Sequence, residues 1–300
     1  MTERAVEYYG REEGRYPGRL KALSRMPAGL YVKGNLPDED IPSVAIAGAR
    51  MCSAYGRQQA YAYAKILAEH GIQIISGLAY GIDASAHEGA LAGGGKTFAV
   101  LGCGVDICYP KENYPLYRQI LSEGGGVLSE FPMGSAPEAW HFPVRNRIIS
   151  GLSDAVLIVE AKERSGSLIT ADYALEQGKS VFALPGRVGD SLSKGCNYLL
   201  YQGAGVAYSP ECIMEELGVR YQKNLERKKR NCKNGLTQEI QKVYECLEIT
   251  PKHLGTLTEE TKMQMPELSK ILLELQAKGF VEEFPRNYWR KFGESYEKMV

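Results

Sequence analysis

Short apolar segments recur from residue 43 onward, and each is separated from the next by a stretch with helical character. Glycines bound most of these segments, as expected for strands buried on both faces of a parallel sheet. The predicted strands are 44–47, 72–75, 97–101, 127–129, 155–159, 181–184 and 206–208. The predicted helices are 56–70, 83–92, 114–122, 142–150, 167–177 and 196–202. This alternation predicts an α/β fold with a Rossmann-like, doubly wound, mostly parallel sheet.

The pattern changes near residue 218. Residues 219–235 carry seven basic side chains and one acidic one, and we interpret them as a basic linker. The linker could be a solvated hinge or a supporting contact to an anionic partner. Residues 236–300 predict a small winged-helix-like domain. Its expected elements are helices at 237–247, 254–257 and 265–278, followed by a hairpin of 280–284 and 288–290.

The first 40 residues have a weak pattern and are expected to form a short N-terminal segment, with residues 16–30 packed on the main domain. The main, Rossmann-like domain is assigned to residues 41–218. No signal peptide and no membrane-spanning apolar run is visible in the sequence.

Charge and cysteine usage exclude several classes of protein. The 36 basic residues balance the 36 acidic ones, so the chain cannot coat nucleic acid by bulk charge, although a local basic patch remains possible. The seven cysteines are scattered and form no CxxC pair, which favours reduced thiols in the cytoplasm. The four histidines lie far apart, so no metal site is expected.

The loops that follow the predicted strands belong to one edge of the sheet, because ligands of open parallel sheets bind beyond the carboxyl ends of the strands. Glycine, serine and arginine dominate these loops. Glycine lets backbone N–H groups approach an anion, and arginine binds phosphate through two N–H groups. An ordinary need for glycine in turns accounts for the glycines of any single loop. It accounts less well for the glycine, serine and arginine found in all of these loops together. The candidate phosphate-binding residues are Gly48, Arg50, Ser76, Gly77, Gly104, Lys111, Arg145, Arg147, Arg164, Ser165, Gly166, Ser167 and Thr170.

Aromatic side chains accompany these loops. Tyr80, Tyr109, Trp140 and Phe142 are candidates to stack on bases, since basic groups and aromatic rings together are typical of single-strand binding. Trp140 and Phe142 could equally belong to the core.

Motifs for nucleotide hydrolysis and nucleophilic catalysis fit poorly. The sequence GCG at 102–104 lacks the third glycine of GxGxxG, and GGGKT at 93–97 precedes a strand where a P-loop would follow one. A catalytic pair of Cys103 and His87 is conceivable, but a strand-end cysteine such as Cys103 is better interpreted as a small core residue. Asp83 and His87 fit a helix start better than a catalytic dyad.

Longer motifs resemble those of one family. They are SGLAYGIDASAH (76–87), GGKTFAVLGCGVDICYP (94–110), SEFP (129–132), HFPVRNRIISGLS (141–153) and EAKERSGSLITADYALEQGKSVFALPG (160–186). From about residue 16 to 217 the chain resembles the DNA-processing protein A family (DprA, also called Smf).

The resemblance implies a cytoplasmic protein that binds single-stranded DNA, protects incoming DNA, and loads the RecA recombinase in natural transformation and recombination. It also implies a homodimer with no cofactor and no established catalytic activity. By motif, Arg50 and Lys111 would hold DNA phosphates and Phe142 would stack on a base. Residues 164–167 and Thr170 would form the phosphate pocket, with Arg145 and Arg147 near it.

Three departures from the family pattern affect these expectations. Ala49 stands where the family usually has serine or threonine, so one hydroxyl donor to phosphate is lost. Ala139 stands where some members have lysine, which predicts one weaker phosphate contact. Many members have a full helical domain before the Rossmann-like part, whereas here about 40 residues precede it.

Two alternatives use the same kind of fold. One is a nucleoside-monophosphate phosphoribohydrolase of the Lonely Guy type, whose PGGxGTxxE helix start supplies a catalytic glutamate. The comparable segment here, 164–170, has no such glutamate, and Asp172 is poorly placed to replace it. The other is a sensor that binds a free mononucleotide.

Overall fold

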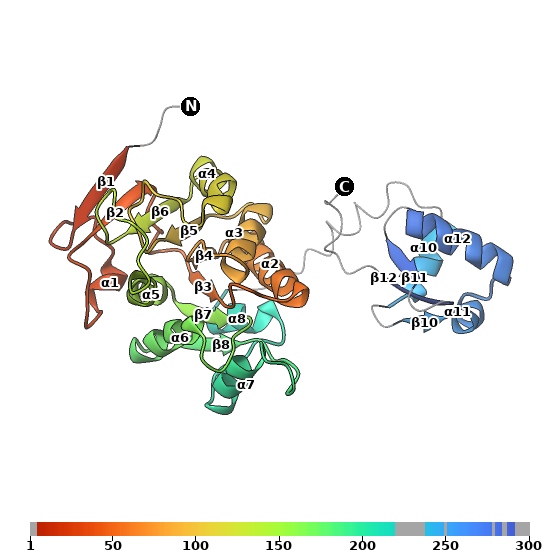
Figure 1. Cartoon of the computed structure of the whole chain (residues 1–300). Coiled ribbons are helices and arrows are strands. Elements are labelled where there is room, and N and C mark those ends of the chain that lie inside the picture. Colours follow the sequence, from red (N-terminus) through yellow and green to blue (C-terminus); the bar gives the residue numbers. More distant parts are fainter. Residues whose placement is uncertain (1–4, 220–237, 249–250, 278–279, 284–286, 292–300) are drawn as a thin grey trace. The chain divides into compact units, whose positions relative to one another are not determined.

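The computed structural model describes residues 5–219, 238–248, 251–277, 280–283 and 287–291 (Figure 1). The chain divides into two units, Met1–Tyr221 and Gln222–Val300, and each is described by itself. Apart from Val219, the predicted basic linker lies outside the described residues, as do parts of the last predicted helix and hairpin.

The first unit is built on a nine-stranded sheet. Its seven strands from β3 to β9 run parallel, and β1 and β2 extend the sheet in antiparallel fashion beside β6. In spatial order the strands are β1 (Val6–Gly10), β2 (Gly29–Gly34), β6 (Gly126–Ser129), β5 (Thr97–Val100), β4 (Gln73–Ser76), β3 (Ser43–Ala47), β7 (Ala155–Ile158), β8 (Ser180–Ala183) and β9 (Gly205–Val206). The predicted doubly wound, mostly parallel sheet is therefore confirmed.

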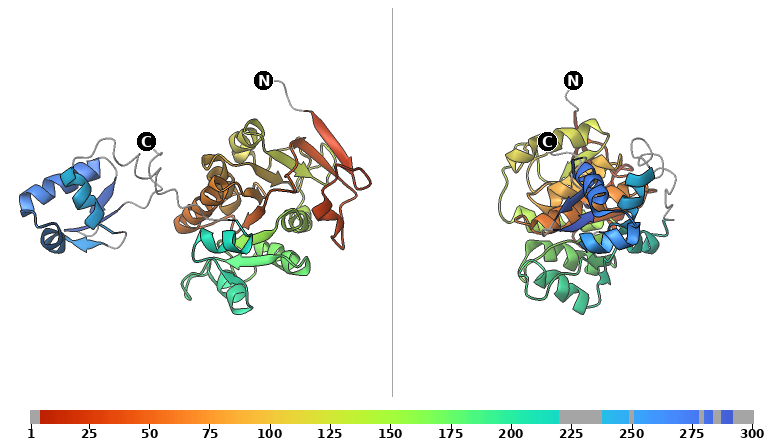
Figure 2. Two further views of the ribbon diagram at one scale, coloured as in Figure 1. Left: turned by 180° about the vertical axis from the view of Figure 1, so that it is seen from behind. Right: turned by 90° about the vertical axis from the view of Figure 1, so that its right-hand side faces the viewer.

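Helices cover both faces of this sheet (Figures 1 and 2). One face packs against α1 (Gly18–Lys21), α5 (His141–Gly151), α6 (Gly166–Glu176) and α7 (Lys194–Tyr201). The other packs against α2 (Ala54–Glu69), α3 (Ile82–Ala92), α4 (Tyr114–Ser122) and α8 (Pro210–Glu216).

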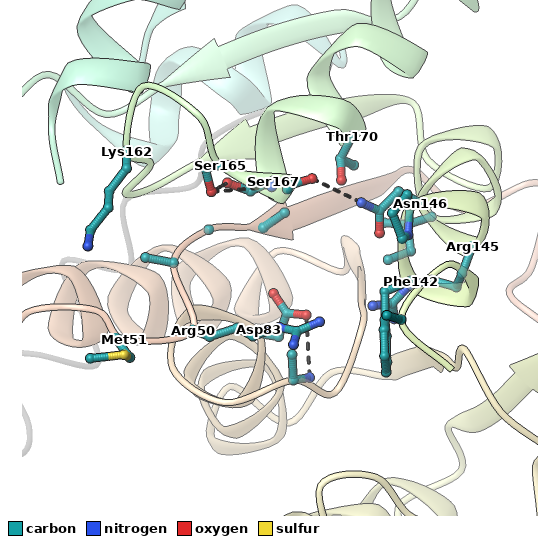
Figure 3. A pocket seen from close by; sticks show the side chains of 18 of the residues that line it. Arg50, Met51, Asp83, Phe142, Arg145, Asn146, Lys162, Ser165, Ser167 and Thr170 are labelled. Carbon is teal, nitrogen blue, oxygen red and sulfur yellow. Dashed lines mark hydrogen bonds between the residues drawn. The ribbon is translucent and has the colours of Figure 1, made fainter. Parts of the chain in front are cut away.

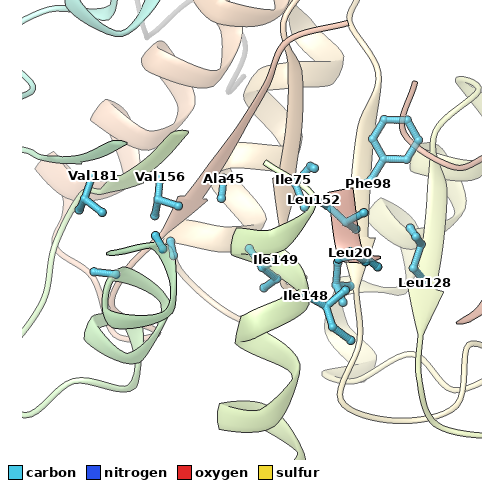
Figure 4. Close-up of a cluster of buried hydrophobic side chains, with 14 of the residues drawn as sticks. Leu20, Ala45, Ile75, Phe98, Leu128, Ile148, Ile149, Leu152, Val156 and Val181 are labelled. Carbon is cyan, nitrogen blue, oxygen red and sulfur yellow. The ribbon is translucent and has the colours of Figure 1, made fainter. Parts of the chain in front are cut away.

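The side chains of successive strand residues point to opposite faces of the sheet, so alternate residues of one strand enter different hydrophobic clusters. Ala45 of β3 joins the first face, whereas Val44 and Ile46 join the second. Figure 4 shows the first cluster, in which Ile148 and Ile149 of α5, and Leu152 just after it, meet the strands. Helix α5 therefore rests on the middle of the sheet, and its first turn reaches the carboxyl edge.

The N-terminal segment contributes more to the fold than its sequence predicts. Tyr16, Leu20 and Leu30 are buried in the first core cluster, so the expected packing of this segment is present. The two strands β1 and β2 were not predicted. Strand β2 pairs with β6, with Tyr31 opposite Ser129, a long-range contact that a local pattern does not reveal.

The second unit has the predicted winged-helix character. It contains α10 (Gln238–Cys246), β10 (Lys252–His253), α11 (Leu254–Thr261), α12 (Met265–Ala277), β11 (Val281–Glu283) and β12 (Tyr288–Lys291). The strands form an antiparallel sheet in the order β10-β12-β11. Val243, Leu257, Leu272 and Trp289 lie in its core. Helix α11 is four residues longer than predicted, and Thr261 in its last turn is buried.

None of the helices in the described part of the chain has the length and apolarity of a membrane span.

Replacing Leu20 with alanine tests the role of the N-terminal segment. The side chain is fully buried, so Leu20→Ala is expected to lower the free energy of unfolding by about 2–5 kcal/mol in urea titrations. The exposed neighbour provides the control: Lys21→Ala should change stability by no more than about 0.5 kcal/mol. Equal, small effects of both variants would mean that the segment is not part of the core.

Candidate functional site

A pocket of about 720 Å³ opens at the carboxyl edge of the sheet, where the direction of winding reverses. From β3 the chain builds strands β4, β5 and β6 to one side, and β7, β8 and β9 lie on the other. Ligands of doubly wound sheets bind at this switch point. The loop after β3 (48–51), the loop after β7 (162–167) and helix α5 all line the pocket (Figure 3). Its volume is in the range of small-molecule sites.

Four basic side chains and one carboxylate line the pocket. The basic residues are Arg50, Arg145, Lys162 and Arg164, and the carboxylate is Asp83. The wall is therefore predominantly positive, although the chain as a whole is neutral.

The start of helix α6 forms one polar wall. Ser165 caps the helix: its Oγ accepts a hydrogen bond from the Ser167 N–H at 3.4 Å and lies 2.8 Å from the Ser167 hydroxyl. Asn146 of α5 ties this loop to the neighbouring helix, since its Nδ2 donates to the Gly166 carbonyl at 3.1 Å. Thr170 also lines the wall (Figure 3). Hydroxyls and free N–H groups at a helix start suit an anion.

An aromatic pair lies across from this wall. Phe142 and Tyr109 both line the pocket, with ring centroids 5.6 Å apart. The guanidinium of Arg50 lies 4.8 Å from the centroid of the Phe142 ring, a cation–π contact. The Arg50 side chain is exposed, whereas Phe142 is half-buried. Cation and aromatic ring are thus adjacent on the same side of the pocket.

The floor holds two buried residues of opposite charge, Arg145 and Asp83. Arg145 is 4% exposed, and its Nη1 donates to the backbone carbonyls of Gly77 and Val100. Asp83 is 8% exposed and accepts a hydrogen bond from the Ala79 N–H at 3.4 Å. Burial raises the pKa of Asp83, while Arg145 favours its ionised form. Burial also lowers the pKa of Arg145 to about 10, so it stays charged at neutral pH.

Of the residues predicted to bind phosphate or a base, ten line the pocket. They are Gly48, Arg50, Tyr109, Phe142, Arg145, Arg164, Ser165, Gly166, Ser167 and Thr170. The loop topology thus brings together residues that are more than a hundred positions apart in the sequence.

Three other predicted residues build the structure around the pocket without lining it. The Ser76 hydroxyl is buried and donates to the Ile46 carbonyl at 2.6 Å. A Cβ at Gly77 would lie 2.2 Å from the Arg145 guanidinium, so only glycine permits that approach. A Cβ at Gly104 would lie 2.5 Å from the Asp106 carboxylate and 2.8 Å from the Pro132 carbonyl.

Arg147 has a structural partner and does not line the pocket. It is 8% exposed and forms a two-point ion pair with Glu130, with N–O distances of 2.9 and 2.6 Å. The Arg147 guanidinium is therefore engaged by Glu130. Lys111 also lies outside the pocket lining, but it is exposed and follows Tyr109, which lines the pocket, by two residues.

Several lining residues were not predicted as ligands: Met51, Asn146 and Lys162. Each lies within or beside a predicted strand-end loop, and this position in the sequence is the signal that could have identified it as a lining residue. The contact of Asn146 with Gly166 depends on α5 and α6 packing together, which the sequence alone does not reveal.

The weak catalytic alternatives receive no support from the geometry. His87 is fully buried, and its Nδ1 lies 2.6 Å from the Thr97 hydroxyl, not beside Cys103. Thr97 donates to the Ile74 carbonyl, so the imidazole Nδ1 donates to Thr97. Burial lowers the pKa of His87 to about 3, which keeps the ring neutral. Burial raises the pKa of Cys103 to about 11, which opposes a thiolate.

Comparison with known proteins assigns the family. The model for DNA recombination-mediator protein A matches residues 7–218, and the model for the DprA winged helix domain matches residues 229–285. The chain belongs to the DprA (Smf) family. The resemblance inferred from the motifs is therefore confirmed.

Individual relatives agree with this assignment. Protein Smf of Escherichia coli is 39% identical over 281 residues, which are 92% of this chain and 75% of that protein. The DNA processing protein DprA of Streptococcus pneumoniae is 45% identical over 201 residues, 67% of this chain and 71% of the relative.

Solved DprA structures share the fold. The S. pneumoniae structure has a TM-score of 0.67 at 41% identity and covers 73% of this chain and 76% of its own. The structure of DNA processing protein A from Helicobacter pylori, which concerns its single-stranded DNA binding mode, has a TM-score of 0.62 at 33% identity. It covers 72% of this chain and 98% of its own.

Removing Arg145 is expected to destabilise the fold, because it leaves Asp83 buried without its partner. Arg145→Ala should lower the free energy of unfolding by about 3–5 kcal/mol. The double variant Arg145→Ala with Asp83→Ala should lose less than the sum of the single variants in a urea double-mutant cycle. Strict additivity would mean that the two side chains do not interact.

His87 predicts a pH dependence of stability. Burial lowers its pKa from 6.5 to about 3, so below pH 6.5 the unfolded chain binds a proton that the folded chain does not. His87 therefore makes stability fall as the pH decreases from 6.5 toward 3. Urea titrations of His87→Gln should show a shallower fall over this range, whereas a slope equal to that of the wild type would contradict the assignment.

Proposed function

We propose that the pocket binds single-stranded DNA. The observation that carries this proposal is the placement of three exposed basic groups and the α6 hydroxyls beside an aromatic pair in one pocket. Cationic groups track a phosphate backbone, and aromatic rings stack on bases irrespective of sequence. Membership of the DprA family and the DNA-binding relative from H. pylori support the same ligand.

The residues divide between the two parts of a nucleotide. Arg50, Lys162 and Arg164 hold phosphates together with the hydroxyls and N–H groups at the start of α6. Phe142 and Tyr109 receive a base. Lys111 contacts a phosphate of the strand outside the pocket. Ala49 and Ala139 line the pocket without a polar group, which weakens two phosphate contacts relative to the family pattern.

The site binds DNA without converting it. Among the described residues that line the pocket, Asp83 alone has a carboxyl group, and it is the partner of Arg145. A glycoside-cleaving site requires a carboxylate next to the sugar, and the α6 start offers serines instead. Release of ribose from AMP would contradict this part of the proposal and favour the phosphoribohydrolase.

The biological role follows from the family. The bound strand is protected and passed to the RecA recombinase during natural transformation and recombination, which agrees with the family description as a recombination mediator. The protein acts in the cytoplasm as a homodimer. The free thiols of the six cysteines in the described residues suit a reducing compartment.

The salt dependence of DNA affinity tests the phosphate contacts. Each phosphate contact contributes a slope of about −0.7 to log affinity against log salt for single strands. Arg50→Ala should weaken binding of a labelled oligothymidylate and flatten this slope by about that amount, measured by fluorescence anisotropy.

A matched control separates a local contact from loss of overall charge. Lys96 is exposed and precedes β5, so it lies at the opposite edge of the sheet. Lys96→Ala removes the same charge and should leave both affinity and slope near wild-type values. Equal effects of the two substitutions would contradict a DNA site at the pocket.

A further inference from the structure

An exposed tryptophan lies next to the pocket. Trp140 is 57% exposed, whereas Trp289, the other tryptophan of the chain, is 5% exposed in the core of the second unit. Trp140 immediately precedes α5 and stands in sequence between Ala139 and Phe142, which both line the pocket. A large apolar ring exposed at the edge of a binding pocket suits contact with a ligand.

The indole ring is held in place from one side. Its Nε1 donates to the Glu138 carboxylate at 2.7 Å. The rings of His141 and Phe131 meet it at steep interplanar angles of 72° and 84°, with centroids 4.1 and 5.9 Å away. Neither neighbour stacks face to face on the indole. The ring is therefore oriented before any ligand binds, which lowers the entropy that binding would lose.

Among the described residues that line the pocket, the aromatic rings are a single pair, Phe142 and Tyr109. Phe142 already has Arg50 4.8 Å from its ring centroid and Tyr109 5.6 Å away. A strand that continues past this pair has to place its next base elsewhere, and Trp140 is the exposed aromatic residue two positions before Phe142.

We propose that Trp140 stacks on the base of a nucleotide adjacent to the one in the pocket, forming a second subsite of the DNA interface. This inference rests on the proposed single-stranded DNA binding. The pocket takes one nucleotide, and Trp140 engages only when the ligand has a second. Base stacking on an aromatic residue requires no sequence-specific hydrogen bond, so the subsite accepts any base.

Tryptophan emission gives a direct test. Titration of the full chain with an oligothymidylate of about 20 nucleotides should quench the emission, because the base stacks on the indole. The Trp140→Phe variant, which retains Trp289, should show no such quenching. Thymidine monophosphate should occupy the pocket without quenching the wild-type chain.

Affinity measurements complete the test. Trp140→Ala should weaken binding of the oligonucleotide by about five- to a hundred-fold, and Trp140→Phe by less. The slope of log affinity against log salt should not change, because the indole carries no charge. A residue that only supports the pocket would alter mononucleotide affinity as well.

The role of Glu138 is tested by a matched pair of variants. Glu138→Gln and Glu138→Ala both remove one negative charge, but only glutamine retains an acceptor for the indole N–H. Weaker binding and less quenching in the alanine variant than in the glutamine variant would show that the hydrogen bond orients the ring.

Two outcomes would overturn the inference in distinguishable ways. Tight oligonucleotide binding with unchanged Trp140 emission and wild-type affinity of Trp140→Ala would refute the second subsite alone. Failure of the wild-type chain to bind the oligonucleotide would refute the proposed function and the subsite together.

Discussion

The pairing of β3 with β7 in the middle of the sheet determines where every element of the site lies. These strands are separated by more than a hundred residues, yet Ala47 is opposite Ile158 at their carboxyl ends. The loop that carries Arg50 and the loop that carries Arg164 therefore start side by side. Because all strands of this part are parallel, no other edge of the sheet could gather these loops. The apolar cores on both faces hold this arrangement.

Within this frame, motif residues have two different tasks. Arg145 and Gly77 belong to the most specific motifs of the chain, yet they act together in the floor of the pocket: the glycine lets the guanidinium reach a backbone carbonyl. A buried charge is costly, and the two backbone carbonyls and the opposite charge of Asp83 reduce this cost for Arg145. Exposed residues such as Arg50 and Trp140 are available to a ligand. The extent of burial, which a motif does not reveal, distinguishes the residues that build the pocket from those that are available to a ligand.

The sequence was sufficient for the parts of the fold that depend on local patterns. The apolar, glycine-bounded strands β3 to β8 lie within one residue of their predicted positions at each end. The site could be assigned to one edge because the rule for parallel sheets depends only on strand order. By contrast, the local sequence pattern does not predict β1 and β2, because β2 is stabilised by pairing with β6, which is distant in the sequence. The ion pair of Arg147 with Glu130 is also a tertiary contact, which the motif around Arg147 does not reveal.

The central claim, that the pocket binds single-stranded DNA, is tested most directly by competition. A labelled oligothymidylate is bound to the full chain at two salt concentrations, and duplex DNA or AMP is added as competitor. The account predicts tight binding that weakens steeply with salt and that neither competitor displaces efficiently. Easy displacement by AMP, or the absence of oligonucleotide binding at low salt, would contradict it.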